Sequence, residues 1–202
     1  MNFINKSRLG LFFVCLFIYA CHQPEPNNST GTESMETGHK AILTIDSFIL
    51  KDHKILASKK ADLNGDGFED VVVIQKHLKE ETLTEQLEVD FVLRPMMILL
   101  GDINGSLNLE VRNDEAVFCF DCGGPMGDPF SELDIDSTTI ILEHYGGSVE
   151  RWARSTHIQY EDSLFIIQSD NMENFNALNP DDAEIVNLLD STIQFVDFNI
   201  YD

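Results

Sequence analysis

Residues 62–74 constrain the fold more than any other stretch of the chain. They read D-L-N-G-D-G-F-E-D-V-V-V-I, so oxygen-bearing side chains recur through a glycine-containing loop that runs directly into β-branched residues. Ca²⁺ takes about six to eight oxygen ligands, and β-branched residues favour strands. We therefore expect a calcium loop that leads into a β-strand. The expected ligands are the side chains of Asp62, Asn64, Asp66 and Asp70 and the backbone carbonyl of Phe68.

A helix-loop-helix calcium site is excluded by the residues that follow the loop. With Asp62 as the first loop position, the twelfth position, where an EF-hand has a bidentate Glu, is Val73. The alternative without a metal is an acidic turn whose Asp and Asn side chains bond their own backbone. Three carboxylates so close together repel one another unless a cation lies between them, which favours a structural Ca²⁺.

The loop and the strand after it resemble the calcium loop of FG-GAP and VCBS-type repeats, in which D-x-[DN]-x-D-G-x-x-D precedes a strand. Residues 94–111, R-P-M-M-I-L-L-G-D-I-N-G-S-L-N-L-E-V, resemble the strand, turn and strand that follow in such a repeat. Propellers need about four to eight blades, and the sequence has no second D-x-N-x-D-G loop. A closed propeller is therefore not expected. Residues 48–170 also resemble uncharacterised bacterial lipoproteins and exported proteins, which implies a location and no activity.

Alternating apolar and polar residues predict a mainly β domain over residues 41–170. We expect an antiparallel sheet or meander, built as a single propeller-blade-like unit or a small sandwich with few short helices. The expected elements are a short helix or turn followed by a strand near 54–58, a strand at 71–75, a charged loop at 77–88, a hairpin of strands 96–100 and 107–112 around Asn104-Gly105, and strands at 133–135, 138–144, 151–160 and 164–168.

Residues 171–202 are expected to form an acidic C-terminal extension. Pro180 and the acids after it could open a short helix. Residues 193–200 alternate as I-Q-F-V-D-F-N-I, which predicts a closing strand or an ordered tail.

The N-terminus predicts export. Residues 1–20 combine Lys6 and Arg8 with an apolar run too short to span a bilayer, which is typical of a signal peptide. The run ends in I-Y-A-C and resembles a lipobox in which Cys21 is lipidated, although Tyr19 departs from the usual pattern. An ordinary cleavage or an uncleaved short anchor is the alternative.

A flexible tether would follow the lipid anchor, because residues 21–40 are rich in Pro, Gly, Ser, Thr and Asn. His22 rather than Asp follows Cys21, which slightly favours the outer membrane. We therefore expect a lipid-anchored protein of the bacterial cell envelope.

The formal net charge of −22 excludes nucleic acid as a partner, because such a surface repels phosphate. The charge is compatible with solubility alone. It is also compatible with capture of a basic protein partner.

Cys119 and Cys122 are the cysteines that remain after the N-terminal segment. In an exported protein such a pair normally forms a disulfide. The glycines and prolines that follow oppose the helix of a thioredoxin-like site. The alternatives are a redox site, a zinc half-site shared across a dimer, and reduced, packed thiols.

An aromatic and basic cluster is the candidate binding surface, for an envelope protein or a glycan. Its members are Tyr145, Arg151, Trp152 and Arg154. The alternative is a strand face with stacked Arg and Trp side chains.

The sequence contains no G-x-S-x-G nucleophile motif, and no catalytic residue is predicted. The favoured function is a lipid-anchored, calcium-stabilised binding or structural module. The alternatives are a redox or hydrolytic envelope enzyme centred on residues 119–128, and an inhibitor-like lipoprotein that binds a basic partner.

Overall fold

The computed structural model describes residues 41–87 and 92–202. The predicted signal segment, the lipidated Cys21 and the tether at 21–40 lie outside the described residues.

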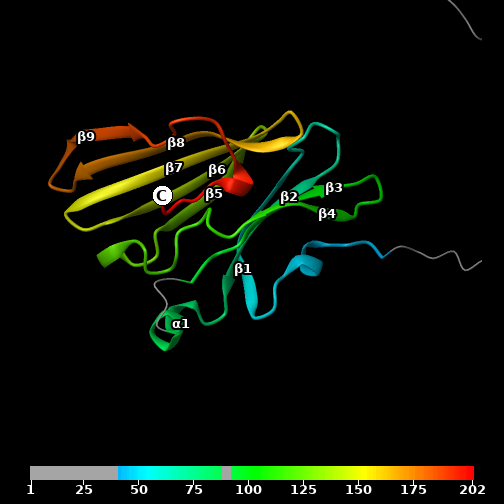
Figure 1. Ribbon diagram of the computed structural model, residues 1–202, viewed down its shortest axis with the longest axis horizontal. Helices are drawn as coiled ribbons and strands as arrows, with labels where there is room; N and C mark the ends of the chain where they lie inside the picture. The colour runs from blue at the N-terminus through cyan, green and yellow to red at the C-terminus, as the bar shows by residue number, and fades with distance from the viewer. Residues whose placement is uncertain (1–40, 88–91) are drawn as a thin grey trace, which may run out of the picture. The chain divides into compact units, whose positions relative to one another are not determined.

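The strands form two antiparallel sheets, which confirms the predicted mainly β fold (Figure 1). One sheet has the strand order β1-β2-β3-β4, and the other has the order β10-β8-β7-β6-β5 with β9 also paired to β8. The described strands close into neither a barrel nor a propeller. The strands are β1 (His53–Ala61), β2 (Asp70–His77), β3 (Met96–Gly101), β4 (Leu107–Asn113), β5 (Phe130–Asp136), β6 (Thr139–Gly147), β7 (Glu150–Glu161), β8 (Leu164–Asn176), β9 (Asn179–Asn187) and β10 (Ile193–Gln194). The helical segments are η1 (Ile45–Phe48), α1 (Glu80–Leu87), η2 (Gly124–Met126) and η3 (Phe195–Asp197).

Strand β2 is buried on both faces, which explains its continuous apolar run. Successive side chains of a strand point to opposite faces. Val72 and Ile74 therefore enter the main core, whereas Val71 and Val73 enter a smaller cluster that also receives Phe48 from the segment around η1. The predicted calcium loop thus leads into the most buried strand of the first sheet.

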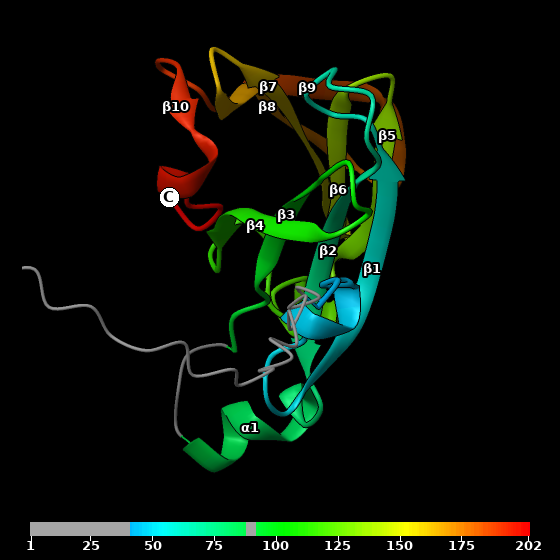
Figure 2. The ribbon, with the colours of Figure 1, turned by 90° about the vertical axis from the view of Figure 1, so that its right-hand side faces the viewer.

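The main core contains side chains from both sheets. Ile98 of β3, Leu142 of β6 and Ile158 of β7 are fully buried in it, and each such side chain contributes about 1.5–3 kcal/mol by leaving water. Strands β1 and β5 lie side by side at one edge of the two sheets (Figure 2). Lys59 Nζ pairs there with Asp134 Oδ1 at 2.8 Å.

The C-terminal segment completes the core, as expected for an ordered tail. It contains the short strand β10 and helix η3, and it buries Phe195, Phe198 and Ile200. The side-chain amide of Asn113 donates to the carbonyl oxygens of Phe195 and Phe198 at 2.5 and 2.7 Å. These bonds fasten the segment to the end of β4.

The prediction of a loop at 77–88 is wrong, because helix α1 occupies most of it. Glu80 and Glu81 lie in the first turn, where carboxylates interact favourably with the helix dipole. Glu80 is also buried beside Arg94, so a tertiary ion pair holds this short helix.

The prediction of a helix opened by Pro180 is also wrong, because strand β9 lies there. Strand β8 continues to Asn176 and therefore crosses the predicted boundary at residue 170. Its long edge pairs with β9. Pro180 is tolerated because β9 is an edge strand, where a missing backbone donor costs little.

Candidate functional site

The predicted calcium loop connects β1 to β2 and is closed by hydrogen bonds from its own backbone. The N–H groups of Gly65, Asp66 and Gly67 donate to the carboxylate of Asp62 at 2.8, 3.2 and 2.9 Å. Gly65 and Gly67 have φ angles of +76° and +87°, which glycine adopts without strain. The backbone therefore folds around Asp62, as it would in the predicted alternative without a metal, an acidic turn whose side chains bond their own backbone.

Asn64 and Asp66 lie together in the same loop. The side-chain amide of Asn64 donates to Asp66 Oδ2 at 2.8 Å, and the N–H of Phe68 donates to Asp66 Oδ1 at 2.9 Å. Asp66 is exposed, and Asp62 and Asn64 are half-buried. Asn64 Oδ1 accepts the N–H of Asp66 at 3.0 Å, so each of these three side chains makes hydrogen bonds within the loop.

Asp70 has a different position from the other predicted ligands. It is fully buried, and its two oxygens accept the N–H groups of Leu63 and Gly101 at 2.8 and 2.9 Å. Asp70 thus ties the loop to the end of β3. The pKa of Asp70 is raised above its ordinary value, mainly by burial. The two amides lower it, and the charges of Asp66 and Asp62 raise it further.

The three carboxylates of the loop do not converge on one point. Among the described residues, the trio of His, Cys, Asp or Glu with ligand atoms within 4.8 Å of one another is Cys119, Asp121 and Cys122. Its two sulfur atoms form a disulfide, so they cannot act as thiolate ligands. Asp62, Asn64, Asp66 and the carbonyl of Phe68 are oxygen donors of the type that Ca²⁺ takes, whereas Asp70 is occupied by the N–H groups of Leu63 and Gly101.

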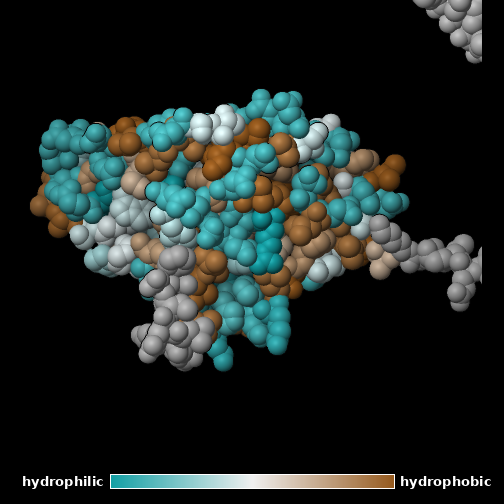
Figure 3. All heavy atoms as spheres, in the orientation of Figure 1, coloured by the Kyte–Doolittle hydropathy of each residue, from teal (hydrophilic) through white to brown (hydrophobic). Residues whose placement is uncertain are grey.

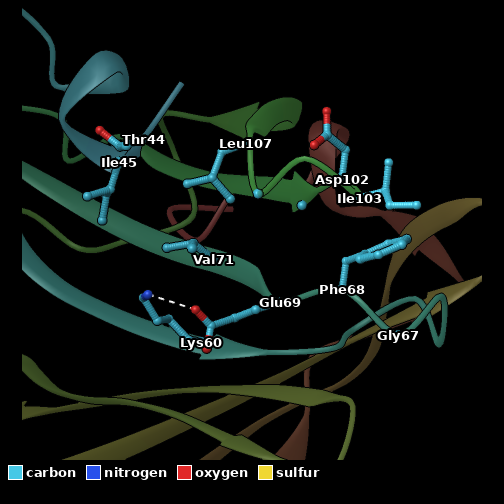
Figure 4. A pocket seen from close by; sticks show the side chains of 12 residues that line it. Thr44, Ile45, Lys60, Gly67, Phe68, Glu69, Val71, Asp102, Ile103 and Leu107 are labelled. Carbon is cyan, nitrogen blue, oxygen red and sulfur yellow. Dashed lines mark hydrogen bonds and ion pairs between the residues drawn. The ribbon is translucent and has the colours of Figure 1, made fainter. Parts of the chain in front are cut away.

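A cavity of about 440 Å³ adjoins the exit of the loop (Figure 4). Phe68, Val71 and Leu107 form apolar parts of its lining, and Ile103, with 80% of its surface exposed, stands at its edge. A Cβ atom on Gly101 would lie 2.4 Å from the carbonyl oxygen of Glu69. Only glycine therefore allows the end of β3 to approach the loop this closely.

The Asn104-Gly105 turn between β3 and β4 is confirmed and forms another part of this cavity. Gly105 has a φ angle of +75°. The carboxylate of Asp102 accepts the N–H groups of Asn104 and Ser106 at 2.8 and 3.0 Å. Asp102 thus has the predicted turn role.

Cys119 and Cys122 form the predicted disulfide, with Cα atoms 5.2 Å apart. Cys119 is buried, and the loop around the pair packs against the end of β6. The N–H of Gly147 donates to the carbonyl of Gly123 at 3.0 Å. A Cβ atom on Gly146 would lie 2.5 Å from the ring of Trp152 and 3.1 Å from the Cα of Gly123.

Arg94 joins helix α1 to the disulfide loop, and sequence reasoning missed it. Its guanidinium is fully buried and makes bidentate contacts to Glu80 (2.8 and 3.0 Å) and Asp128 (2.7 and 2.7 Å). It also donates to the carbonyl of Phe118 at 3.3 Å. Its position, directly before Pro95 and a run of apolar residues, was the available signal.

The candidate binding surface is divided between the two faces of the second sheet, because neighbouring residues of a strand alternate. Arg151 Nη1 donates to Tyr145 Oη at 2.6 Å on one face. Trp152 packs against Phe118 on the other. Arg154 is buried on that inner face, so the four residues do not form one surface.

His144 is buried between Phe118, Phe130 and the two buried arginines. Its Nε2 accepts the N–H of Phe118 at 3.3 Å, and its Nδ1 has no hydrogen-bond partner. Burial, followed by the charges of Arg154 and Arg94, lowers the pKa of His144 to about 3. The ring is therefore neutral at physiological pH.

Ser155, His157 and Glu143 lie together on the outer face of the second sheet. Ser155 Oγ donates to Glu143 Oε1 at 2.6 Å and lies 3.1 Å from His157 Nε2. In a hydrolytic triad the acid orients the histidine, whereas here it contacts the serine. The arrangement therefore does not match a Ser-His-acid triad.

No protein-family model, curated protein or solved structure matches the chain. No helix within 41–87 or 92–202 has the length and apolarity needed to cross a membrane.

Proposed function

We propose that this protein is a calcium-stabilised β module of the bacterial cell envelope, anchored by lipid at Cys21, which acts by binding rather than by catalysis. The observation that carries the proposal is the grouping of the oxygen-bearing side chains of Asp62, Asn64 and Asp66 in one loop, where Asp62 accepts the N–H of Asp66 and Asn64 donates to Asp66. The lipid anchor rests on the sequence alone.

Ca²⁺ would be held by Asp62, Asn64, Asp66 and the carbonyl of Phe68. The bound ion would supply positive charge to a loop whose carboxylates repel one another. The same charge would act on Asp70, whose pKa is raised by burial and by its acidic neighbours. Because Asp70 bonds the N–H of Gly101, the ion would stabilise the junction between the loop and β3.

The disulfide supports an extracytoplasmic location, because such bonds persist in oxidising compartments. It also argues against a redox or hydrolytic site at residues 119–128. Cys119 is buried, and Asp128 is engaged by Arg94. The groups that such chemistry would use are therefore part of the packing.

The cavity beside the loop supports a binding role. Its volume of about 440 Å³ falls within the usual range for small ligands, and its wall is partly apolar (Figure 4). The ion pair between Lys60 Nζ and Glu69 Oε1, at 2.7 Å, lies in its lining. A ligand there would contact Phe68 and would therefore be sensitive to the state of the loop.

The test is titration of the purified domain with Ca²⁺ in a calorimeter, for the wild type, Asp66→Asn and Asp181→Asn. Asp181 is an exposed acid of β9 and serves as the matched control. We expect binding at roughly 10⁻⁴ to 10⁻³ M in the wild type and the control, and at least tenfold weaker binding in Asp66→Asn. Equal affinities in all three proteins would refute the calcium site.

The lipid anchor needs a separate test. Metabolic labelling with a fatty-acid analogue should mark the wild type and leave Cys21→Ser unlabelled. Label in both proteins would contradict attachment at Cys21.

A further inference from the structure

A second cavity, of about 530 Å³, lies between β8, the loop after β9 and the C-terminal segment. Its volume is suited to a small ligand. Apolar side chains form much of its wall, including Met172, Leu189 and Phe198. This cavity shares no lining residue with the cavity beside the predicted calcium loop, so the two cavities are separate.

The cavity contains a buried ion pair whose positive member is fully engaged. Arg154 donates from Nε and Nη2 to the two carboxylate oxygens of Asp170 at 3.0 and 2.6 Å. Its Nη1 donates to the carbonyl of Ile200 at 2.6 Å, and its guanidinium lies 5.8 Å from the centre of the Phe198 ring. The positive charge of Arg154 is therefore matched within the protein, and the cavity is poorly suited to an anion.

The walls of the cavity are held in place before any ligand binds. The N–H of Ile200 donates to the carbonyl of Glu115 at 2.9 Å, and the hydroxyl of Tyr201 donates to the carbonyl of Val117 at 3.3 Å. On the opposite side, the N–H of Leu188 donates to the carbonyl of Asp170 at 2.8 Å. A ligand would therefore lose little free energy to ordering of the site.

The charge of the lining is negative. Asp190 and Asp202 are exposed in the lining, and Asp170 is buried in it. Among the described residues that line the cavity, Arg154 is the one basic side chain. Figure 3, which is coloured by hydropathy, shows hydrophilic side chains with hydrophobic ones among them in the region of β9, at the upper left.

We propose that this cavity binds an organic cation, with an ammonium group at Asp190 and Asp202 and an apolar stem against Met172 and Leu189. An alkyl stem fits the apolar wall, and the ammonium group is attracted by the two exposed carboxylates. The same chemistry occurs in a free alkyl amine and in a lysine side chain of a protein. The proposal does not depend on the bound calcium.

The first test is an NMR titration of the ¹⁵N-labelled protein with hexylamine, which is protonated at pH 7, and with hexanoate as the anionic control. We expect saturable shifts of the Leu189 and Tyr201 amides with hexylamine and none with hexanoate. Equal binding of hexanoate, or shifts that do not saturate, would overturn the proposal.

Paired variants separate the cavity from the general acidity of the chain. Asp190→Asn/Asp202→Asn should weaken hexylamine binding roughly tenfold. Asp181→Asn/Glu184→Gln removes the same charge from exposed positions of β9 and should change the affinity by less than about twofold in about 150 mM salt. A similar loss in both pairs would mean non-specific attraction and would contradict a site in the cavity.

A third titration distinguishes the two sources of the cation. N-acetyl-lysine amide carries the ammonium group on a shorter stem attached to a peptide unit. Tighter binding than hexylamine would indicate a basic protein partner, and weaker binding a free amine. Absence of binding by both compounds would refute the proposal.

Discussion

The two glycine-containing loops of this protein are stabilised in opposite ways. The predicted calcium loop at 62–70 is exposed at residues 65–67 and 69 and is held by hydrogen bonds between its acidic side chains and its own backbone. The disulfide loop at 117–130 is held by a covalent bond, close packing of Gly123 and Gly146, and the buried Arg94. The first loop is therefore held by local hydrogen bonds, whereas the second is held by a covalent bond and by packing against the core.

Loss of Arg94 should have the largest effect. Arg94→Leu leaves Glu80 buried, with Lys76 as its remaining ion-pair partner, and also removes the partner of Asp128. We expect the free energy of unfolding to fall by about 3–5 kcal/mol, measured by urea denaturation. Arg112→Leu, which removes an exposed pair with Asp114, should cost less than about 1 kcal/mol. Similar losses in both variants would show that Arg94 is not a structural clamp.

Removal of the disulfide should have the next largest effect. Cys119→Ala/Cys122→Ala opens a short covalent loop, with a sequence separation of 3. The chain-entropy relation gives a loss of about 2 kcal/mol for a loop this short. Urea denaturation of the variant and of the reduced wild type should give the same midpoint. A midpoint equal to that of the oxidised wild type would mean that packing alone holds the loop.

The buried His144 makes the core around the disulfide loop sensitive to acid. Its folded pKa of about 3 lies below the ordinary value of 6.5, so the unfolded state binds more protons between these values. The stability is therefore fully present above pH 6.5 and falls as the pH drops towards about 3, by up to about 1.4 kcal/mol per pH unit.

His144→Gln should reduce this dependence, because glutamine can still accept the N–H of Phe118 and does not titrate. The measurement is the urea midpoint from pH 7.5 to 4.5, compared with the wild type and with His53→Gln, which alters a histidine of β1. An unchanged slope in His144→Gln would contradict the assignment.

Calcium should have the smallest effect and should act on the loop at 62–70. Millimolar Ca²⁺ should stabilise the wild type by about 1 kcal/mol, which corresponds to a rise in Tm of about 2–4 °C. The Tm of Asp62→Ala should be the same in Ca²⁺ and in the chelator EGTA. The Tm of Cys119→Ala/Cys122→Ala should still be higher in Ca²⁺ than in EGTA. If the disulfide variant also lost the response, the two loops would not be independent.

Residues with local roles were predictable from the sequence. The strand after the loop follows from consecutive β-branched residues, and the turn at Asn104 follows from the glycine beside it. The pairing of Cys119 with Cys122 follows from their being the two cysteines left after the N-terminal segment of a chain expected to be exported. In each case the physical cause lies within a few residues along the chain.

Residues with long-range partners were not predictable. Arg94, Asp128 and Glu80 are separated in sequence, and only the fold shows that one guanidinium binds both acids. Strand β9 was mistaken for a helix because its acidic residues and proline suit a helix start. Pairing with the free edge of β8 decided its conformation.

The sequence by itself therefore determined the mainly β class, the turn at Asn104-Gly105 and the disulfide, because these depend on neighbouring residues. The tertiary structure decided that Asp70 anchors a strand, that Arg154 is buried rather than exposed, and that the C-terminal segment lines one side of a cavity. Burial and ion pairing between distant segments are properties of the folded chain, since they arise only when the sheets and the C-terminal segment pack together.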